Sequence, residues 1–294
     1  ILTGYFNLNK VLEITLHNGV DPVTGKKLGI ETGEPREFKT FEELMDAFEK
    51  QLNHFIDIKI RGNNLIEKIY QKYMPCPFLS IIIDDCIKKG MDYNGGGARY
   101  NTSYIQGVGI GTITDTLASI KQNVYDNNDL SMDKLLEVLD ANFEGYEDIR
   151  SRFINHSPKY GNDDDYADSI MKEVFELFYE SVNGRVNMKG GQYRINMLPT
   201  TCHVYFGSVL GATADGRKAK EPLSEGISPV QGRDQYGPTA VIKSASKMDH
   251  IKTGGTLLNQ KFTPRLLQDE QGIDNLLHLV RAYFKGSSKV SWKT

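Results

Sequence analysis

One stretch of the sequence, residues 194–229, constrains the fold more than any other. It opens as a predicted strand, Arg194-Ile195-Asn196-Met197, which the dipeptide Leu198-Pro199 interrupts. Proline cannot donate to a sheet ladder, and it restricts the residue before it to extended backbone. Composition alone favours the simpler interpretation, a strand edge followed by a turn-rich connection. The more specific prediction is a buried strand that breaks at Leu198-Pro199, re-aims its side chains there and resumes over residues 202–206.

A second stretch, from Gln106 to Gly111, carries glycine at alternate positions. Alternate glycines along extended backbone leave one face bare, so another backbone or a ligand can approach closely. The spacing differs from the dinucleotide-binding fingerprint, which needs G-x-G-x-x-G after a strand and an acidic residue about 20 positions later. We expect this stretch and the strand around Met197 to lie together inside the fold.

The remaining pattern alternates helices with short strands. Apolar residues at helical spacing predict helices that begin near Leu8, at a Thr40–Glu43 capping box, at Thr114, at Ser131, after Asp165 and at Asp274. Gly62 predicts a break in the second of these helices. Short apolar runs predict strands at residues 240–242 and 256–258, while the run 79–83 fits either a strand or a core helix. Such alternation favours an α/β architecture, and no internal domain boundary is visible.

The composition argues against several classes of function. A formal net charge of −3 gives no reason to expect nucleic acid or an anionic membrane as a partner, and no apolar run is long enough to span a bilayer. The three cysteines are too scattered for a zinc site or a disulfide framework, and unpaired thiols favour the cytoplasm. Aspartates at 163–165 lack the ligand alternation of a calcium loop, so helix capping explains them and no metal is expected.

Several motifs go further, because together they resemble the glycyl radical enzymes of the pyruvate formate-lyase superfamily. They are Gly97-Ala98-Arg99-Tyr100-Asn101, Gln106-Gly107-Val108-Gly109, Tyr160-Gly161-Asn162-Asp163-Asp164, and Gly211-Ala212-Thr213-Ala214-Asp215-Gly216-Arg217 with residues 222–229. The resemblance runs from Leu2 to about Lys285. Within the superfamily, residues 2–5, 58–64 and 198–203 resemble the members that dehydrate trans-4-hydroxy-L-proline.

The resemblance implies a barrel of two half-barrels surrounded by helices. Residues 1–285 would form the C-terminal half of that barrel, incomplete, and residues 286–294 an unmatched tail. It also implies a glycyl radical, installed by a radical S-adenosylmethionine activase, and a cysteine thiyl radical that abstracts hydrogen from C5 of the substrate. Loss of the 4-hydroxyl then gives 1-pyrroline-5-carboxylate. Such enzymes are expected to be cytoplasmic homodimers.

The same resemblance assigns a substrate site. Thr200 would contact the substrate carboxylate, while Leu198 and Tyr5 would pack against the ring. The hydroxyl chemistry is reasonable, because a carboxylate buried in a barrel must be hydrogen-bonded. The alternative is that Thr200 satisfies its own turn and Tyr5 is a core aromatic.

The sequence departs from the family pattern in two places. It holds no Gly-Cys-Val-Glu motif for the thiyl cysteine and no Arg-Val-x-Gly-Tyr motif for the radical glycine, so no catalytic residue is assigned. We expect a fragment of a longer enzyme, begun at Ile1 after a missing start, that shows neither a glycyl radical nor dehydration by itself. Cys202 is expected to be inert packing on a core strand rather than a substitute nucleophile. Formate C-acetyltransferase, a lyase acting on glycerol or choline, and a non-catalytic binding subunit remain alternatives.

Overall fold

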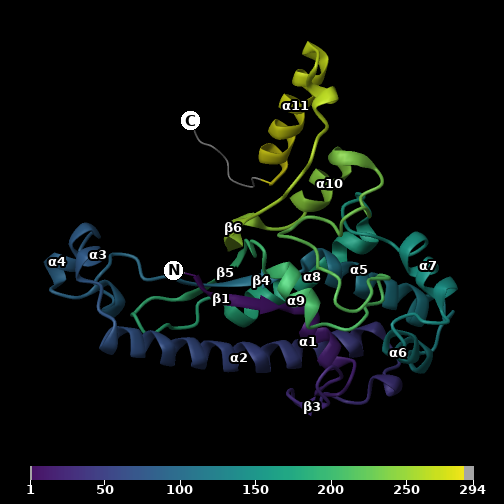
Figure 1. Cartoon of the computed structure of the whole chain (residues 1–294), viewed down its shortest axis with the longest axis horizontal. Helices are drawn as coiled ribbons and strands as arrows, with labels where there is room; N and C mark the ends of the chain where they lie inside the picture. Colours follow the sequence, from purple (N-terminus) through teal and green to yellow (C-terminus); the bar gives the residue numbers. More distant parts are fainter. Residues whose placement is uncertain (1, 288–294) are drawn as a thin grey trace.

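The computed structural model describes residues 2–287, so all but the first two residues of the predicted tail lie outside the described part. Its centre is a sheet of four parallel strands in the order β1 (Leu2–Asn7), β4 (Ser103–Val108), β5 (Tyr193–Met197) and β6 (Thr253–Thr256). Figure 1 shows the long helix α2 running along one side of this sheet, with α11 extending away from the rest of the molecule. Parallel strands need crossover connections, and helices supply them here. The predicted α/β class is confirmed.

One face of the sheet packs on helices. These are α1 (Leu8–Thr15), α2 (Phe41–Tyr73), α5 (Ile110–Ile120) and α8 (Asp165–Val182). On that face Phe6 of β1 stacks on Phe178 of α8, with ring centroids 5.9 Å apart. A Cβ on Gly107 of β4 would lie 2.8 Å from both Phe178 and Met197. Gly107 therefore lets α8 and β5 approach β4 closely, as the sequence predicted. The expectation that glycines alternate along extended backbone as far as Gly111 is wrong, because Gly109 is the left-handed N-cap of α5 (φ 82°) and Gly111 lies within that helix.

The other elements surround this core. They are β2 (Val20–Asp21), β3 (Lys26–Lys27), α3 (Pro77–Ile82), α4 (Cys86–Lys89), α6 (Met132–Asp140), α7 (Glu147–Asn155), α9 (Cys202–Ser208), α10 (Gly237–Ser246) and α11 (Glu270–Ser287), with a π-helical turn at Lys121–Asp126 and 3-10 turns at Pro35–Glu37, Tyr93–Gly95, His250–Lys252 and Pro264–Leu267.

The helix starts expected from capping residues are largely confirmed. Thr40 and Glu43 form the capping box of α2, and the Ser131 hydroxyl accepts the Lys134 N–H at the start of α6. Asp164 caps α8, which supports the capping explanation of the aspartate run. The described residues hold no cluster of three or more side chains suited to a metal ion. Helix α5 begins at Ile110, four residues before the expected cap.

Two predicted strands are wrong. Residues 202–206 belong to helix α9, because the left-handed turn at Thr200 (φ 51°) redirects the chain before it. Residues 240–242 belong to helix α10, which has Pro238 in its first turn and buries one face. A short apolar run carries too little periodicity to separate a strand from a helix. The strand expected at 256–258 lies earlier, as β6.

Two expectations about α2 and α3 are also corrected. Helix α2 continues through Gly62, which is exposed and has open space around its α-carbon. The cost of a glycine in a helix interior, about 1 kcal/mol, is small beside the burial along this 33-residue helix. The ambiguous run 79–83 lies largely in helix α3, none of whose residues is buried.

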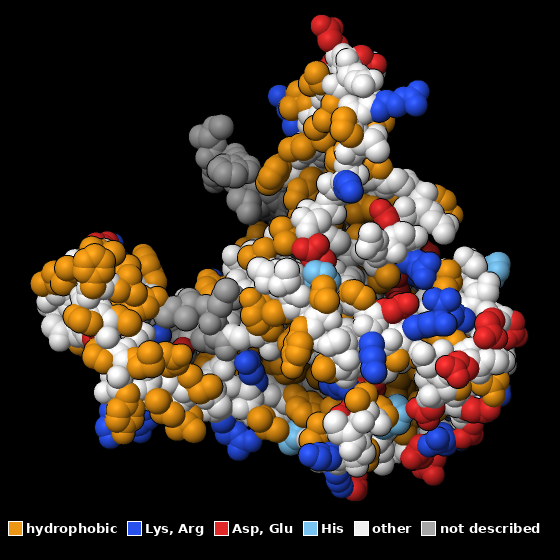
Figure 2. Space-filling view, in the orientation of Figure 1, with side chains coloured by type: hydrophobic (Ala, Val, Ile, Leu, Met, Phe, Trp, Pro, Cys, Tyr) orange, Lys and Arg blue, Asp and Glu red, His pale blue; other side chains and the backbone are white. Residues whose placement is uncertain are grey.

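Apolar side chains also gather on the surface, over α3 and α4 and along α11, whereas charged ones gather over α6 and α7 (Figure 2). The exposed large apolar residues of these apolar areas include Phe78, Ile81, Ile82, Ile87, Ile273, Leu277, Val280 and Phe284. Among residues 2–287, no helix combines the length and the apolar character needed to cross a membrane.

Candidate functional site

The second face of the sheet carries polar side chains at the carboxyl ends of its strands. Tyr5 pairs in register with Gln106, and Gln106 with Asn196, so these three side chains share the face opposite Phe178. The Gln106 side-chain oxygen accepts the Leu198 N–H at 2.9 Å. This bond satisfies a backbone donor just where β5 ends. Ligands of parallel α/β sheets characteristically bind at the carboxyl ends of the strands.

The structure brings the predicted site residues together at this edge. The Tyr5 hydroxyl lies 3.3 Å from the Thr200 hydroxyl, although 195 residues separate them. Leu198 precedes the same turn and lies against Gly255 of β6. Tyr5 and Leu198 are half-buried and Thr200 is exposed. The arrangement supplies hydroxyl donors beside an apolar surface, which suits the binding of a small polar molecule. A contact with substrate remains a prediction.

Helix α9 follows the turn and is held tightly by the segment 221–223. The Leu223 N–H donates to the His203 carbonyl at 3.1 Å. A Cβ on Gly207 would lie 2.1 Å from the Glu221 carbonyl oxygen and 2.8 Å from the Pro222 α-carbon. Cys202 is the first residue of this helix and half-buried, so the expectation that it lies on a core strand is wrong.

Replacing Gly207 with alanine should therefore destabilise the chain. The obstructing atoms are backbone, so α9 must shift, at a cost of about 1–3 kcal/mol. The matched control is Gly62→Ala in α2, where nothing lies within 4 Å and alanine should stabilise by roughly 0.5–1 kcal/mol. Urea unfolding measures both changes. Equal effects of the two substitutions would show that α9 is not packed as described.

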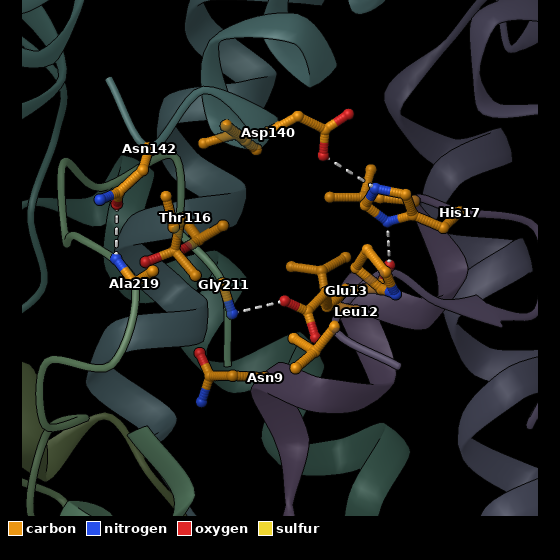
Figure 3. A pocket seen from close by; sticks show the side chains of 15 residues that line it. Asn9, Leu12, Glu13, His17, Thr116, Asp140, Asn142, Gly211 and Ala219 are labelled. Atoms are coloured by element: carbon orange, nitrogen blue, oxygen red, sulfur yellow. Dashed lines mark hydrogen bonds and ion pairs between the residues drawn. The ribbon is translucent and has the colours of Figure 1, made fainter. Parts of the chain in front are cut away.

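The loop from Gly211 to Arg217, which carries the family resemblance, is anchored by two side chains that the sequence did not single out. Glu13 of α1 accepts the Gly211 N–H at 2.7 Å, and Asn142 accepts the Ala219 N–H at 2.7 Å. Figure 3 shows both anchors on the wall of a cavity of about 180 Å³ between α1, α5, α6 and this loop. None of Tyr5, Leu198 and Thr200 lines this cavity.

Arg217 holds the loop from inside. Its guanidinium is buried and donates to the carbonyls of Gly211, Lys218 and Glu221 at 2.5, 2.7 and 2.9 Å. Burial lowers the pKa of Arg217 from its ordinary value. Because its two terminal nitrogens donate to three backbone carbonyls, Arg217 acts as a structural brace for the loop.

The start of α5 and the motif that begins at Tyr160 both pack on the segment 222–229. Thr112 and Ser224 exchange two hydrogen bonds, each hydroxyl accepting the other residue's N–H, at 2.8 and 3.0 Å. The Tyr160 hydroxyl donates to the Ile227 carbonyl at 2.8 Å. Gly161 has φ 94°, and a Cβ there would lie 2.2 Å from Pro229. Segments far apart in the sequence thus form one framework behind the strand ends.

Two buried ionisable side chains, Asp115 and Lys159, lie in the same framework. Asp115 of α5 accepts the Tyr160 N–H at 2.8 Å, and burial raises the pKa of Asp115 to about 8. Lys159 donates to the carbonyls of Phe153 and Ser157, and burial lowers the pKa of Lys159. Neither group reaches the edge at Tyr5 and Thr200, so both are part of the scaffold.

Comparison with known proteins places this chain among enzymes. The family model for pyruvate formate lyase-like proteins matches residues 1–207, and the glycine radical model matches residues 223–294. The trans-4-hydroxy-L-proline dehydratase of Clostridioides difficile is 62% identical over 284 residues, which are 97% of this chain and 36% of that protein. The second match includes residues 286–294, and the proposed boundary at Lys285 stays a prediction.

Solved structures agree with these matches. The crystal structure of hydroxyproline dehydratase from Clostridioides difficile, with trans-4-hydroxy-L-proline bound, superposes with a TM-score of 0.96 at 61% identity and covers 98% of this chain and 36% of that one. The glycerol-bound form of the B12-independent glycerol dehydratase from Clostridium butyricum gives 0.93 at 39% identity, over 97% and 36% of the two chains. This chain therefore spans about a third of the length of these relatives.

Proposed function

The chain belongs to the pyruvate formate lyase-like family of glycyl radical enzymes, and we propose that it forms part of a hydro-lyase acting on trans-4-hydroxy-L-proline. The observation that supports this substrate is the 62% identity, along nearly the whole chain, to a dehydratase that acts on the same compound. In the proposed reaction the 4-hydroxyl leaves as water and the product is 1-pyrroline-5-carboxylate. The part played by this chain is to bind and orient the substrate.

The strand ends give that part a chemical basis. The hydroxyls of Tyr5 and Thr200 are 3.3 Å apart. The Tyr5 hydroxyl can donate to a carboxylate, and the Thr200 hydroxyl can join it by turning its proton away from the Pro199 carbonyl, to which it donates here. Leu198 and the Tyr5 ring offer apolar surface to a saturated five-membered ring. Holding the ring between them would fix which carbon faces the radical, and positioning of this kind accounts for a large share of enzymatic rate enhancement.

The radical chemistry belongs to other groups. The sequence holds neither Gly-Cys-Val-Glu nor Arg-Val-x-Gly-Tyr, so its residues do not fit the thiyl cysteine or the radical glycine, and no catalytic step is assigned to them. The match of the glycine radical model supports a glycyl radical in the family. The proposal also includes a radical S-adenosylmethionine activase that installs the glycyl radical. The intact enzyme would be a homodimer and would lie in the cytoplasm.

Substitution of Thr200 tests the substrate contact. The test protein is the Clostridioides difficile dehydratase with its matching segment replaced by residues 1–285 of this chain, a swap that 62% identity makes feasible. Thr200→Ala should lower kcat/KM for trans-4-hydroxy-L-proline about ten- to a hundredfold. This range corresponds to the loss of one hydrogen bond to a charged group, which costs roughly 1.5–3 kcal/mol. Thr200→Ser should recover much of that loss, because it keeps the hydroxyl.

If Thr200→Ala dehydrates the substrate as well as the unmodified chimera does, Thr200 is not a ligand. If the unmodified chimera is inactive while the intact relative is active, the proposed substrate fails for this chain. Glycerol is the comparison substrate, because the glycerol-bound dehydratase shares the fold at 39% identity. Turnover of glycerol in place of hydroxyproline would favour a polyol dehydratase.

A further inference from the structure

Thr200 has an unusual backbone conformation. Its φ of 51° lies in the left-handed region, which β-branched residues rarely occupy. Such strain persists only where the surroundings enforce it, and it concentrates at functional sites. The question is which contacts enforce it here.

Hydrogen bonds close the turn on both sides of Thr200. The Thr200 hydroxyl donates to the Pro199 carbonyl at 2.7 Å, and the Cys202 N–H donates to the same carbonyl at 3.0 Å. The Thr200 carbonyl accepts a hydrogen bond from Nδ1 of His203 at 3.0 Å. Because a carbonyl can only accept, the proton of the neutral imidazole must be on Nδ1.

His203 is itself fixed in place. Its own carbonyl accepts the Leu223 N–H, and the close contact of Gly207 with residues 221–222 seats the helix that carries it. The imidazole therefore links the Thr200 carbonyl to a helix that the segment 221–223 holds in place. The Thr200 hydroxyl, on the same residue, faces the Tyr5 hydroxyl.

We propose that His203 is a positioning residue, which donates from Nδ1 to the Thr200 carbonyl and so holds the Thr200 hydroxyl beside Tyr5 for the substrate carboxylate. The conformational part of this role stands on the structure alone. The substrate part rests on the proposed function. In this role His203 acts through Thr200.

The first test uses the full chain and nuclear magnetic resonance, without substrate. Nitrogen-15 labelling of histidine should show His203 as the Nδ1–H tautomer, and carbon-13 labelling of threonine should show the shifts of a left-handed residue for Thr200. His203→Asn keeps a donor close to the position of Nδ1, so those threonine shifts should persist. His203→Leu removes the donor, and His203→Gln places it farther out, near Nε2, so in both variants the Thr200 shifts should move toward extended values. An Nε2–H tautomer, or unchanged Thr200 shifts in His203→Leu, would overturn the proposal.

The second test uses the chimeric dehydratase. His203→Leu should raise KM for trans-4-hydroxy-L-proline about tenfold with a smaller change in kcat, as expected when binding of substrate and transition state is lost equally. His203→Asn should restore most of that affinity. In a Thr200→Ala background, His203→Leu should raise KM less than about twofold, because residues acting through one contact are not additive. A purely structural role would give the same loss in both backgrounds, and that result would refute the proposal.

The two tests separate the two hypotheses. An inactive chimera with the expected resonance results removes the proposed substrate and leaves His203 as the residue that holds Thr200. An active chimera in which His203→Leu behaves as wild type removes the positioning role and leaves the proposed function intact.

Discussion

Replacing Phe178 with alanine is expected to lower the free energy of unfolding of this chain by about 3–5 kcal/mol. Phe178 is fully buried between α8 and the sheet, stacks on Phe6 and lies against the bare face of Gly107. Alanine removes the ring from the point where α8 contacts both β1 and β4. The sheet holds the backbone of both strands in place, so the cavity that the substitution leaves can collapse only in part.

The matched control is Phe78→Ala. Phe78 lies on α3 with 77% of its surface exposed, so the same truncation there should change the free energy of unfolding by no more than about 0.5 kcal/mol. Urea titration followed by circular dichroism measures both variants. Should Phe178→Ala fail to fold, Phe178→Leu provides a milder step, with a cost of roughly 1–2 kcal/mol. Equal losses at the two positions would contradict the packing between α8 and the sheet.

The sequence predicted those parts of the fold that depend on neighbouring residues. Capping at Thr40 and Ser131 is local chemistry, and it is confirmed. The glycines after Gln106 also predicted a close approach to a strand, which Gly107 makes. The register between Gln106 and Asn196 places the two singled-out stretches side by side. A glycine pattern is informative because few other causes require a bare strand face.

The parts that the sequence did not predict depend on tertiary contacts. The five residues at 202–206, four of them apolar, suit a strand or a helix, and the left-handed turn at Thr200 decides between the two. No local pattern could reveal that Glu13 accepts the Gly211 N–H across 198 residues of sequence. His203 could not be separated from an ordinary helical histidine either, since its significance lies in the strained residue to which it donates.

Asp115 illustrates a tertiary effect with a measurable pH dependence. The residue is fully buried; one carboxyl oxygen accepts the Tyr160 N–H, and the other has no hydrogen-bond partner in the described structure. Burial raises the pKa of Asp115 from its ordinary value of 3.8 to about 8, and the neighbouring Asp215 adds to the rise. The nearby Lys159 and Arg233 oppose this shift, but burial outweighs them.

The sign of the effect follows from proton binding. Between about pH 4 and pH 8 the folded chain keeps the Asp115 proton, whereas the unfolded chain releases it near its ordinary pKa. The folded state then binds more protons, so the free energy of unfolding falls as pH rises through this window. The group contributes up to roughly 1.4 kcal/mol per pH unit within the window.

Asp115→Asn should remove this contribution while keeping an oxygen that can accept the Tyr160 N–H. We expect the variant to lose less stability than the wild type as pH rises from 5 to 8, so that its stability relative to the wild type increases over this range. Urea unfolding at pH 5, 6.5 and 8 measures the difference between the two proteins. Shared groups that do not interact with Asp115 cancel in this difference, whereas the buried Lys159, which interacts with Asp115, contributes to it. The matched control is Asp148→Asn on the exposed first turn of α7, which should follow the wild-type slope. If Asp115→Asn loses stability with pH as steeply as the wild type does, Asp115 is ionised in the folded chain. The nearby Lys159 and Arg233 must then offset the cost of burying that charge.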